Sequence, residues 1–182
     1  MGRLEGKVAL ISGGARGQGA AEARAFVKEG AKVVFGDIID KNGYEVEGEI
    51  NKTSEASKYI HLDVTNEADW VSAINTTVTT FGKLNVLVNN AAIVIPRVPI
   101  EQRTVDEWER VQAVNSKGVF LGAKHAIPEM RRAGGGSIIN ICSVAGFGQS
   151  TTQEPAYAAS KGAVRVLSKV IATQHAKDKI RS

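Results

Sequence analysis

Short apolar segments alternate with helical segments along the 182 residues of this chain. Five of the apolar segments are expected to form strands, and they cover residues 7–12, 32–37, 59–64, 85–89 and 137–143. Strands that are apolar on both faces and separated by helices predict a parallel sheet with helices on both faces. Right-handed crossovers then make this a doubly wound α/β sheet, in which functional residues are expected at the carboxyl ends of the strands.

The segments between these strands carry helix signals such as polar caps, stopping glycines and a proline in a first turn. The predicted helices cover about 20–29, 41–50, 66–81, 104–132 and 155–176. Thr65 or Asn66 can cap the third, and the capping box Thr104-Val-Asp-Glu107 opens the fourth. We expect the fourth to be broken into more than one piece near 104–115. No linker or repeat interrupts the order, so a single domain is expected over 1–182.

Composition limits the possible partners. Charged residues make up 23% of the chain, the formal net charge is +4, and 5% of residues are aromatic. The charges are interspersed and form no basic stripe with stacking aromatic residues, so nucleic acid is not an expected partner. No apolar stretch is long enough to cross a membrane and no apolar leader precedes the first strand, which favours a cytoplasmic location. The one cysteine, Cys142, fits a reducing compartment and is expected at a buried strand position, with catalysis as the alternative.

A glycine-rich turn follows the first predicted strand. The sequence Ser12-Gly-Gly-Ala-Arg-Gly-Gln-Gly19 contains Gly13, Gly17 and Gly19. Glycine permits a tight turn, close approach to a pyrophosphate and close packing of a helix on a strand. The helix that follows would direct its free N–H groups towards the phosphates. The glycine turn alone is weak support, but in this strand–loop–helix context it predicts a dinucleotide site.

Asp37 ends the second predicted strand, 18 residues after Gly19. This offset is close to the roughly 20 residues expected for a carboxylate that binds ribose hydroxyls. A carboxylate repels a 2′-phosphate and so favours NAD, whereas the guanidinium of Arg16 in the glycine loop could hold that phosphate. Because Asp37 would lie directly at the ribose, we predict NAD, with NADP as the alternative.

Tyr157 and Lys161 are four residues apart in the last predicted helix, so their side chains project from one face. An ammonium beside a phenol favours the phenolate, which can exchange a proton with an alcohol or ketone oxygen. Ser143 lies fourteen residues before Tyr157 at the end of an apolar run. The Tyr157–Lys161 spacing alone is also that of an ordinary amphipathic pair, so its interpretation depends on the other motifs.

Together these residues resemble the short-chain dehydrogenase/reductase family, and the resemblance covers the entire chain. The family's motifs have counterparts here in the same order, namely residues 12–19 for the glycine loop, Asp63 followed by Val64 at the adenine, 89–92 for Asn-Asn-Ala-Gly, Asn115, Ser143, and Tyr157 with Lys161. Two positions depart from the family, because Ser12 replaces a threonine and Ala92 replaces a glycine whose backbone must here tolerate a β-carbon.

The resemblance implies a Rossmann-like fold and hydride transfer between NAD and a secondary alcohol or ketone. Tyr157 would be the general acid/base, Lys161 would lower the pKa of Tyr157 and bind the nicotinamide ribose, Ser143 would hold the substrate oxygen, and Asn115 would position a water connecting Lys161 to solvent. The alternative for Ser143 and Asn115 is a bond to nearby backbone only. The implied cofactor-binding residues are Gly13, Arg16, Gly17, Gln18, Gly19, Asp37, Asp63, Val64, Asn90, Ala91, Tyr157 and Lys161. No metal is expected.

The resemblance also suggests a chain truncated at its C-terminus, because a sixth strand would only begin at 180–182 and the family's later strands and substrate lid are absent. Helices near 105–132 and 155–176 would suit a homodimer or homotetramer. The segments 93–100 and 144–156, the second one residue longer than in the family, are mostly apolar and favour a hydrophobic, cyclic or steroid-like alcohol. The alternative functions are a non-catalytic nucleotide-binding scaffold and an NADP-dependent carbonyl reductase.

Overall fold

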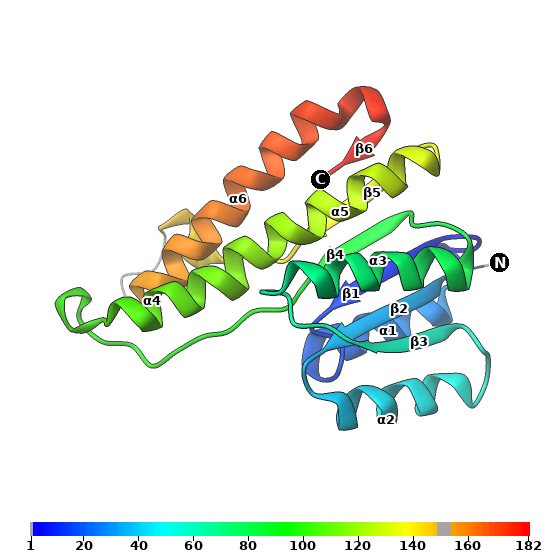
Figure 1. Ribbon diagram of the computed structural model, residues 1–182, viewed down its shortest axis with the longest axis horizontal. Helices are drawn as coiled ribbons and strands as arrows, with labels where there is room; N and C mark the ends of the chain where they lie inside the picture. Colours follow the sequence, from blue (N-terminus) through cyan, green and yellow to red (C-terminus); the bar gives the residue numbers. More distant parts are fainter. Residues whose placement is uncertain (1, 149–153) are drawn as a thin grey trace.

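Six parallel strands form one sheet in a computed structural model that describes residues 2–148 and 154–182 (Figure 1). Their order is β3-β2-β1-β4-β5-β6, so the chain winds outward from β1 on one side and then from β4 on the other. The strands are β1 Val8–Ser12, β2 Lys32–Asp37, β3 Ser57–His61, β4 Val86–Asn89, β5 Gly136–Asn140 and β6 Ile180–Arg181. All paired strands are parallel, which confirms the doubly wound sheet predicted from the sequence.

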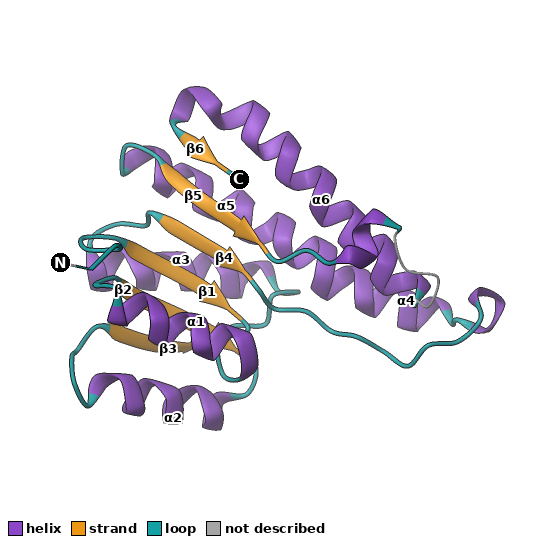
Figure 2. Cartoon of the chain, turned by 180° about the vertical axis from the view of Figure 1, so that it is seen from behind, coloured by secondary structure: helices purple, strands orange, loops and turns teal. Residues whose placement is uncertain are grey.

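Helices cover both faces of the sheet (Figure 2). They are α1 Gly17–Lys28, α2 Asp40–Asn51, α3 Glu67–Phe81, α4 Val105–Gln112, α5 Gly118–Arg132 and α6 Pro155–His175. α1 and α2 pack into one apolar cluster, whereas α3, α5 and the end of α6 pack into the other. Within β1, Ala9 and Ile11 belong to the first cluster and Leu10 to the second. Because alternate side chains enter different cores, the strand must be apolar throughout.

Two strands end earlier than the sequence predicts. The prediction extends the third strand through Val64, but β3 ends at His61. The Asp63 carboxylate accepts hydrogen bonds from the N–H and the hydroxyl of Thr65, at 2.9 and 2.8 Å, and this local turn replaces strand pairing. The prediction extends the fifth strand through Ser143, but β5 ends at Asn140, directly opposite the last residue of β4.

The region 104–132 is helical throughout, but its hydrogen bonding changes in the middle. A π-helical segment, η2 Ala113–Lys117, lies between α4 and α5 and keeps right-handed helical backbone at both of its ends. At the position of the predicted break, the helix therefore continues through a wider, π-helical turn and is not interrupted. Such π segments are rare and frequently lie at functional sites. The capping box of Thr104 and Glu107 is confirmed, and Asn66 is the cap of α3.

The carboxyl ends of the parallel strands lie along one edge of the sheet. β1 and β4 are neighbours in the sheet, although their paired residues Ile11 and Val88 are 77 positions apart in the sequence. The winding direction reverses between these two strands, and such a reversal is where open α/β sheets bind ligands. Among the described residues, no helix has both the length and the apolar character needed to cross a membrane.

Candidate active site

A pocket of about 520 Å³ lies among the loops that follow β1, β2, β3 and β4. Its lining includes residues that the sequence analysis assigned to the cofactor, which are Gly13, Arg16, Gly17, Asp37, Asp63, Val64, Asn90 and Ala91. Four assigned residues do not line it, namely Gln18, Gly19, Tyr157 and Lys161. Gln18 donates a hydrogen bond of 2.9 Å to Glu22, one turn further along α1, and Gly19 packs against the Gly13 carbonyl. The pocket thus gathers segments far apart in the sequence at the winding reversal.

The glycine loop is open on one side and tightly packed on the other. Gly17 has a φ of +55°, in the region that only glycine adopts without strain, and a β-carbon there would meet nothing within 4 Å. A β-carbon on Gly19 would instead lie 2.2 Å from the Gly13 carbonyl oxygen. The first turn of α1 can therefore approach the loop closely while the loop backbone remains accessible. This arrangement fits a phosphate group at the N-terminus of α1.

Asp37 connects the end of β2 to the glycine loop. Its carboxylate accepts hydrogen bonds from the N–H of Ala15 at 3.1 Å and from the N–H of Ile39 at 3.2 Å. The group is only partly buried and lines the pocket, so it retains acceptor capacity for ribose hydroxyls. Arg16 also lines the pocket and is exposed. Asp37 and Arg16, the two residues on which the choice between NAD and NADP depends, therefore line the same pocket.

Ser12 and Asn90 hold the two halves of the sheet together at the pocket. The buried Ser12 hydroxyl accepts hydrogen bonds from the N–H groups of Asn90 and Ala91, both at 3.2 Å. The Asn90 amide donates to the carbonyl groups of Ser12 and Gly13, at 3.0 and 3.1 Å. Ala92 is unstrained, because Lys179 is the only non-glycine residue with a positive φ in the described part of the chain.

Lys161 and Tyr157 lie together on the predicted face of α6. Lys161 is 3% exposed, and its ammonium donates a hydrogen bond of 2.7 Å to the Ile141 carbonyl. The same ammonium lies 5.7 Å from the centroid of the Tyr157 ring. Burial lowers the pKa of the Lys161 ammonium, and the nearby thiol of Cys142 opposes this shift. A cation is therefore held against the ring of the tyrosine at the carboxyl edge of the sheet.

Ser143 follows β5 and caps the short 3₁₀ helix η3 Val144–Phe147. Its hydroxyl oxygen accepts a hydrogen bond from the N–H of Ala145 at 3.1 Å, which is the local bond that the sequence left open as an alternative. The segment packs directly on α6, because a β-carbon on Gly146 would lie 2.6 Å from the Lys161 carbonyl oxygen. The prediction for Cys142 is wrong, since this residue follows the strand, is only partly buried, and donates to the Lys161 carbonyl at 3.3 Å.

Asn115 is fully buried in the π segment and connects it to two other segments. Its side-chain oxygen accepts from the N–H of Ile93 at 2.8 Å. Its side-chain nitrogen donates to the Ile93 carbonyl at 3.0 Å and to the Ser160 hydroxyl at 3.1 Å. The amide therefore clamps the segment after β4 onto α6, one residue before Lys161. A role for Asn115 in positioning water at Lys161 stays a prediction.

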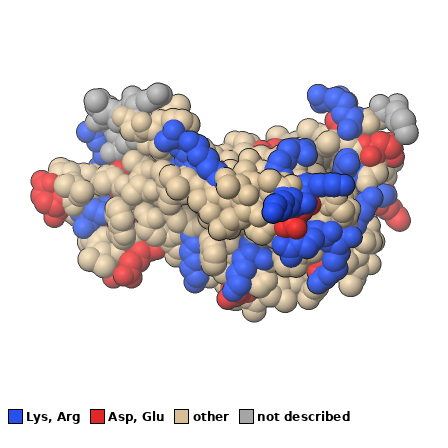
Figure 3. All heavy atoms as spheres, turned by 90° about the horizontal axis from the view of Figure 1, so that it is seen from above, with Lys and Arg blue, Asp and Glu red and all other residues tan. Residues whose placement is uncertain are grey.

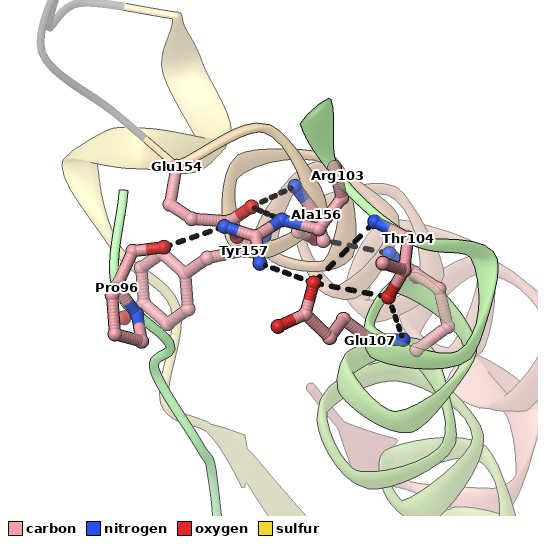
Figure 4. A network of polar contacts seen from close by, with 8 residues as sticks. Pro96, Arg103, Thr104, Glu107, Glu154, Ala156 and Tyr157 are labelled. Atoms are coloured by element: carbon pink, nitrogen blue, oxygen red, sulfur yellow. Dashed lines mark hydrogen bonds and ion pairs between the residues drawn. The ribbon is translucent and has the colours of Figure 1, made fainter. Parts of the chain in front are cut away.

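The first turn of α6 is held by two residues that the sequence analysis does not identify (Figure 4). Glu154 accepts hydrogen bonds from the backbone N–H groups of Ala156 and Tyr157, at 3.1 and 2.6 Å. It also pairs with the guanidinium of Arg103 at 2.9 Å, and each side chain of this pair is 4% exposed. A carboxylate just before Pro155 is a helix-capping signal that the sequence does contain. Its partner lies 51 residues away, and only the fold reveals it.

Part of the predicted substrate wall at 144–156 lies outside the described residues, because 149–153 are not among them. The described parts of both predicted walls carry exposed apolar side chains, which are Val94, Ile100, Val144 and Phe147. No group of three histidine, cysteine or acidic residues is placed to hold a metal ion within 2–148 and 154–182.

The sequence also matches a known family over almost its entire length. The family profile described as short chain dehydrogenase covers residues 7–182. The chain therefore belongs to the short-chain dehydrogenase family, whose members use nicotinamide cofactors, and the resemblance noted from its motifs is confirmed.

Three curated relatives show how similar the chain is to individual proteins. It is 51% identical over 173 residues to 3-alpha-(or 20-beta)-hydroxysteroid dehydrogenase of Mycobacterium tuberculosis, covering 95% of this chain and 65% of that protein. It is 45% identical over 172 residues to 2,5-dichloro-2,5-cyclohexadiene-1,4-diol dehydrogenase LinX of Sphingobium indicum, covering 94% and 68%. It is 38% identical over 181 residues to cyclopentanol dehydrogenase of Comamonas testosteroni, covering 100% and 72%. The chain thus spans about two thirds of the length of these relatives.

Proposed function

We propose that the protein is an NAD-dependent dehydrogenase that interconverts a secondary alcohol and its ketone. The observation that carries the proposal is the buried Lys161 ammonium, 5.7 Å from the Tyr157 ring centroid, at the same edge of the sheet as the nucleotide-sized pocket. When bound, NAD supplies the acceptor for the hydride that leaves the alcohol carbon. The chain's own residues then have to bind the cofactor, orient the alcohol and move its proton.

Each catalytic side chain has one task in this proposal. The Tyr157 hydroxyl oxygen takes the proton of the alcohol during oxidation and returns it to the ketone oxygen during reduction. The Lys161 ammonium is fixed by the Ile141 carbonyl, so that its positive charge lies beside the tyrosine ring. The Ser143 oxygen accepts from Ala145 but keeps its own hydrogen, which can be donated to the substrate oxygen.

The residues around the pocket fit NAD. Open backbone at Gly17 and the N-terminus of α1 suit the pyrophosphate, and the Asp37 carboxylate suits the adenosine ribose hydroxyls. NADP is less well accommodated, since a 2′-phosphate would lie against the Asp37 carboxylate. Arg16 is the group that would favour NADP, and it is exposed to solvent at the rim of the pocket.

We infer that the substrate is a hydrophobic, cyclic secondary alcohol. Val94 and Ile100 in the segment after β4 are 68% and 71% exposed, and Val144 and Phe147 in η3 are also exposed. Exposed apolar side chains beside a polar catalytic group favour a substrate with a large apolar body. The names of the relatives, which refer to a hydroxysteroid, a cyclohexadiene diol and cyclopentanol, support the same class.

Replacement of Tyr157 by phenylalanine tests the proposed function in the intact protein. We expect the wild-type protein to oxidise alcohols from a panel of hydroxysteroids and cycloalkanols with NAD. Tyr157→Phe should lower kcat by about 10²- to 10⁴-fold, because the proton acceptor is lost, while the Kd for NAD changes less than about twofold. Turnover is followed by NADH absorbance and binding by calorimetry.

The outcomes separate the candidate functions. Near-normal turnover in Tyr157→Phe would contradict the assigned chemistry. A wild-type protein that binds NAD but oxidises no alcohol of the panel would support the non-catalytic scaffold. Tighter binding of NADP than of NAD would support the carbonyl reductase alternative.

We also infer that copies of the chain pair through α4, α5 and α6. Apolar side chains on these helices are exposed, namely Trp108, Phe120, Val166 and Val170. Figure 3 looks onto the side of the molecule where α6 lies, and it shows a wide uncharged area between groups of charged side chains. A second copy of the same surface is the occupant that this proposal assigns to it, as a homodimer or as part of a homotetramer.

A further inference from the structure

We propose that Arg103 and Glu154 act as a pair of positioning residues that fix Tyr157 for proton transfer. The proposal rests on the dehydrogenase function proposed above and adds to it two residues that lie outside the nucleotide pocket. It is carried by the contacts that these two side chains make with the first turn of α6 and with the segment after β4 (Figure 4).

Glu154 determines where α6 begins. The first N–H groups of a helix have no partner within the helix and need an external acceptor. The Glu154 carboxylate accepts two of them, from Ala156 and from Tyr157 itself, and its negative charge lies at the positive end of the helix dipole. The backbone of the proposed acid/base is therefore bonded directly to this carboxylate, and a shift of Glu154 would shift the Tyr157 ring.

Arg103 connects that carboxylate to the proposed substrate wall. Its guanidinium donates to Glu154 at 2.9 Å, to Glu107 at 2.8 Å and to the carbonyl of Pro96. Pro96 belongs to the 93–100 segment, and Glu107 to the first turn of α4. A guanidinium can serve three acceptors in a fixed plane, whereas an ammonium cannot reproduce this fork. One side chain thus sets the position of the substrate wall relative to Tyr157.

The burial of the pair argues for a role beyond stability. Both side chains are 4% exposed, and two charges removed from water gain little or nothing in stability over an apolar pair. Separating such a pair leaves an uncompensated buried charge, so each charge has to keep its partners. Here the partners are the backbone of Tyr157 and the segment that faces the substrate, so the geometry that is fixed is that of the reacting groups.

The test compares three variants of the intact protein. Glu154→Gln keeps the size of the side chain but removes its charge, and Arg103→Lys keeps a cation but loses the fork. The matched control is Arg131→Lys, which alters an arginine–carboxylate pair with Asp178 just beyond the other end of α6, at 2.8 Å. We expect kcat to fall about 10- to 100-fold in the first two variants, since a displacement of about 1 Å can cost this much. The control should keep kcat within about twofold.

Three further measurements distinguish the positioning role from a merely structural one. The Kd for NAD should change less than about twofold in both variants, because neither residue lines the pocket. Amide hydrogen exchange at Ala156 and Tyr157 should become faster in Glu154→Gln, since their shared acceptor is weakened. The double variant should lose no more kcat than the more damaged single variant, as expected for residues that act as a unit.

The inference and the proposed function fail in different ways. If the wild-type protein oxidises alcohols and both single variants retain its kcat, the positioning role is overturned. A loss of kcat that only matches the fraction of unfolded protein overturns it as well. If the wild-type protein oxidises no alcohol, the proposed function has failed, and unchanged exchange at Tyr157 in Glu154→Gln then also refutes the positioning contact. Should that variant not fold, Glu154→Asp replaces it with the same exchange measurement and the same criterion.

Discussion

Asp37 has two tasks, because its carboxylate supports the glycine loop through Ala15 and also faces the pocket. We expect Asp37→Asn to weaken NAD binding by about tenfold or more, since a hydrogen bond to a charged acceptor contributes about 1.5–3 kcal/mol. NADP should bind relatively better, because the repulsion of its 2′-phosphate is removed. Calorimetric titration with both cofactors measures this, with Asp106→Asn on α4 as a control that changes neither Kd. An unchanged ratio of the two affinities would place the adenosine ribose away from Asp37.

The buried charge of Lys161 should lower the free energy of unfolding of the protein. Lys161 is 3% exposed, and none of the ion pairs formed by the described residues involves it. Lys161→Met should raise the free energy of unfolding by about 1 kcal/mol near pH 7, because a desolvated charge is removed. The variant should also lose turnover and bind NAD more weakly. Urea unfolding and NADH absorbance measure the two effects, and destabilisation by several kcal/mol would contradict the first.

The pH dependence of this difference follows from the lowered pKa of Lys161. Between that lowered value and the unfolded value of about 10.4, the unfolded chain binds more protons than the folded chain. The stability of the wild-type protein should therefore rise with pH in this window, and the advantage of Lys161→Met should shrink. A difference that stays constant from pH 7 to pH 10 would be inconsistent with a buried ammonium.

The sequence predicts a site residue best when the residues that identify it lie close together in the chain. Tyr157 with Lys161 and the glycines of 12–19 are spaced within one turn or loop, so their placement follows from the helix period and from loop chemistry. The side-chain bonds of Asn115 to Ile93 span 22 residues, and the pair Arg103–Glu154 spans 51. No local pattern contains such contacts, because they depend on how separate elements pack.

At the scale of elements, α2 contains two glycines, Gly43 and Gly48, whose replacement by alanine should have opposite effects on stability. A β-carbon on Gly43 would lie 2.0 Å from the ring of Tyr59, which is 1% exposed, whereas a β-carbon on Gly48 would meet nothing within 4 Å. Gly43→Ala should destabilise the protein by about 1–3 kcal/mol through overpacking. Gly48→Ala should stabilise it by about 0.5–1 kcal/mol through helix propensity. Urea unfolding of both variants measures these changes.

The same pair of variants also tests the connection of α2 to the pocket. The Tyr59 hydroxyl donates to the Asp37 carbonyl at 2.7 Å, so displacement of its ring should disturb the end of β2. We expect weaker NAD binding in Gly43→Ala and unchanged binding in Gly48→Ala. Equal stability of the two variants would show that α2 moves away from the sheet without cost.

The elements themselves follow from the sequence more closely than their ends do. Apolar runs and capping signals predict the strands and helices, because each depends on residues within the same segment. The ends of β3 and β5 depend on the Asp63 turn and on the length of β4, respectively. The π segment at 113–117 has no such local signal, and the sequence predicts only that the helical region changes there.

At the scale of the whole molecule, the exposed apolar side chains of α5 and α6 should control assembly. We expect Phe120→Lys and Val166→Lys to increase the proportion of monomer, because a lysine at the centre of an interface must be desolvated. Val71→Lys on α3, which is also partly exposed, should leave the assembly unchanged. Light scattering during gel filtration measures the mass of each variant. A wild-type protein that is monomeric at all concentrations would refute the proposed pairing.

The strand order divides the sheet into two halves, β3-β2-β1 and β4-β5-β6. Residues before 65 contain the glycine loop, Asp37 and Asp63, whereas residues after 90 contain Ser143 and the Tyr157 helix. The halves meet along β1 and β4, where the Ser12 hydroxyl accepts hydrogen bonds from the N–H groups of Asn90 and Ala91 in the loop after β4. Under the function proposed above, substitutions at Asp37 or Arg16 would alter the choice of nucleotide, whereas substitutions in 93–100 or 144–156 would alter the choice of alcohol. Under the same proposal, the winding of this sheet would let the two preferences change through substitutions in different segments of the chain.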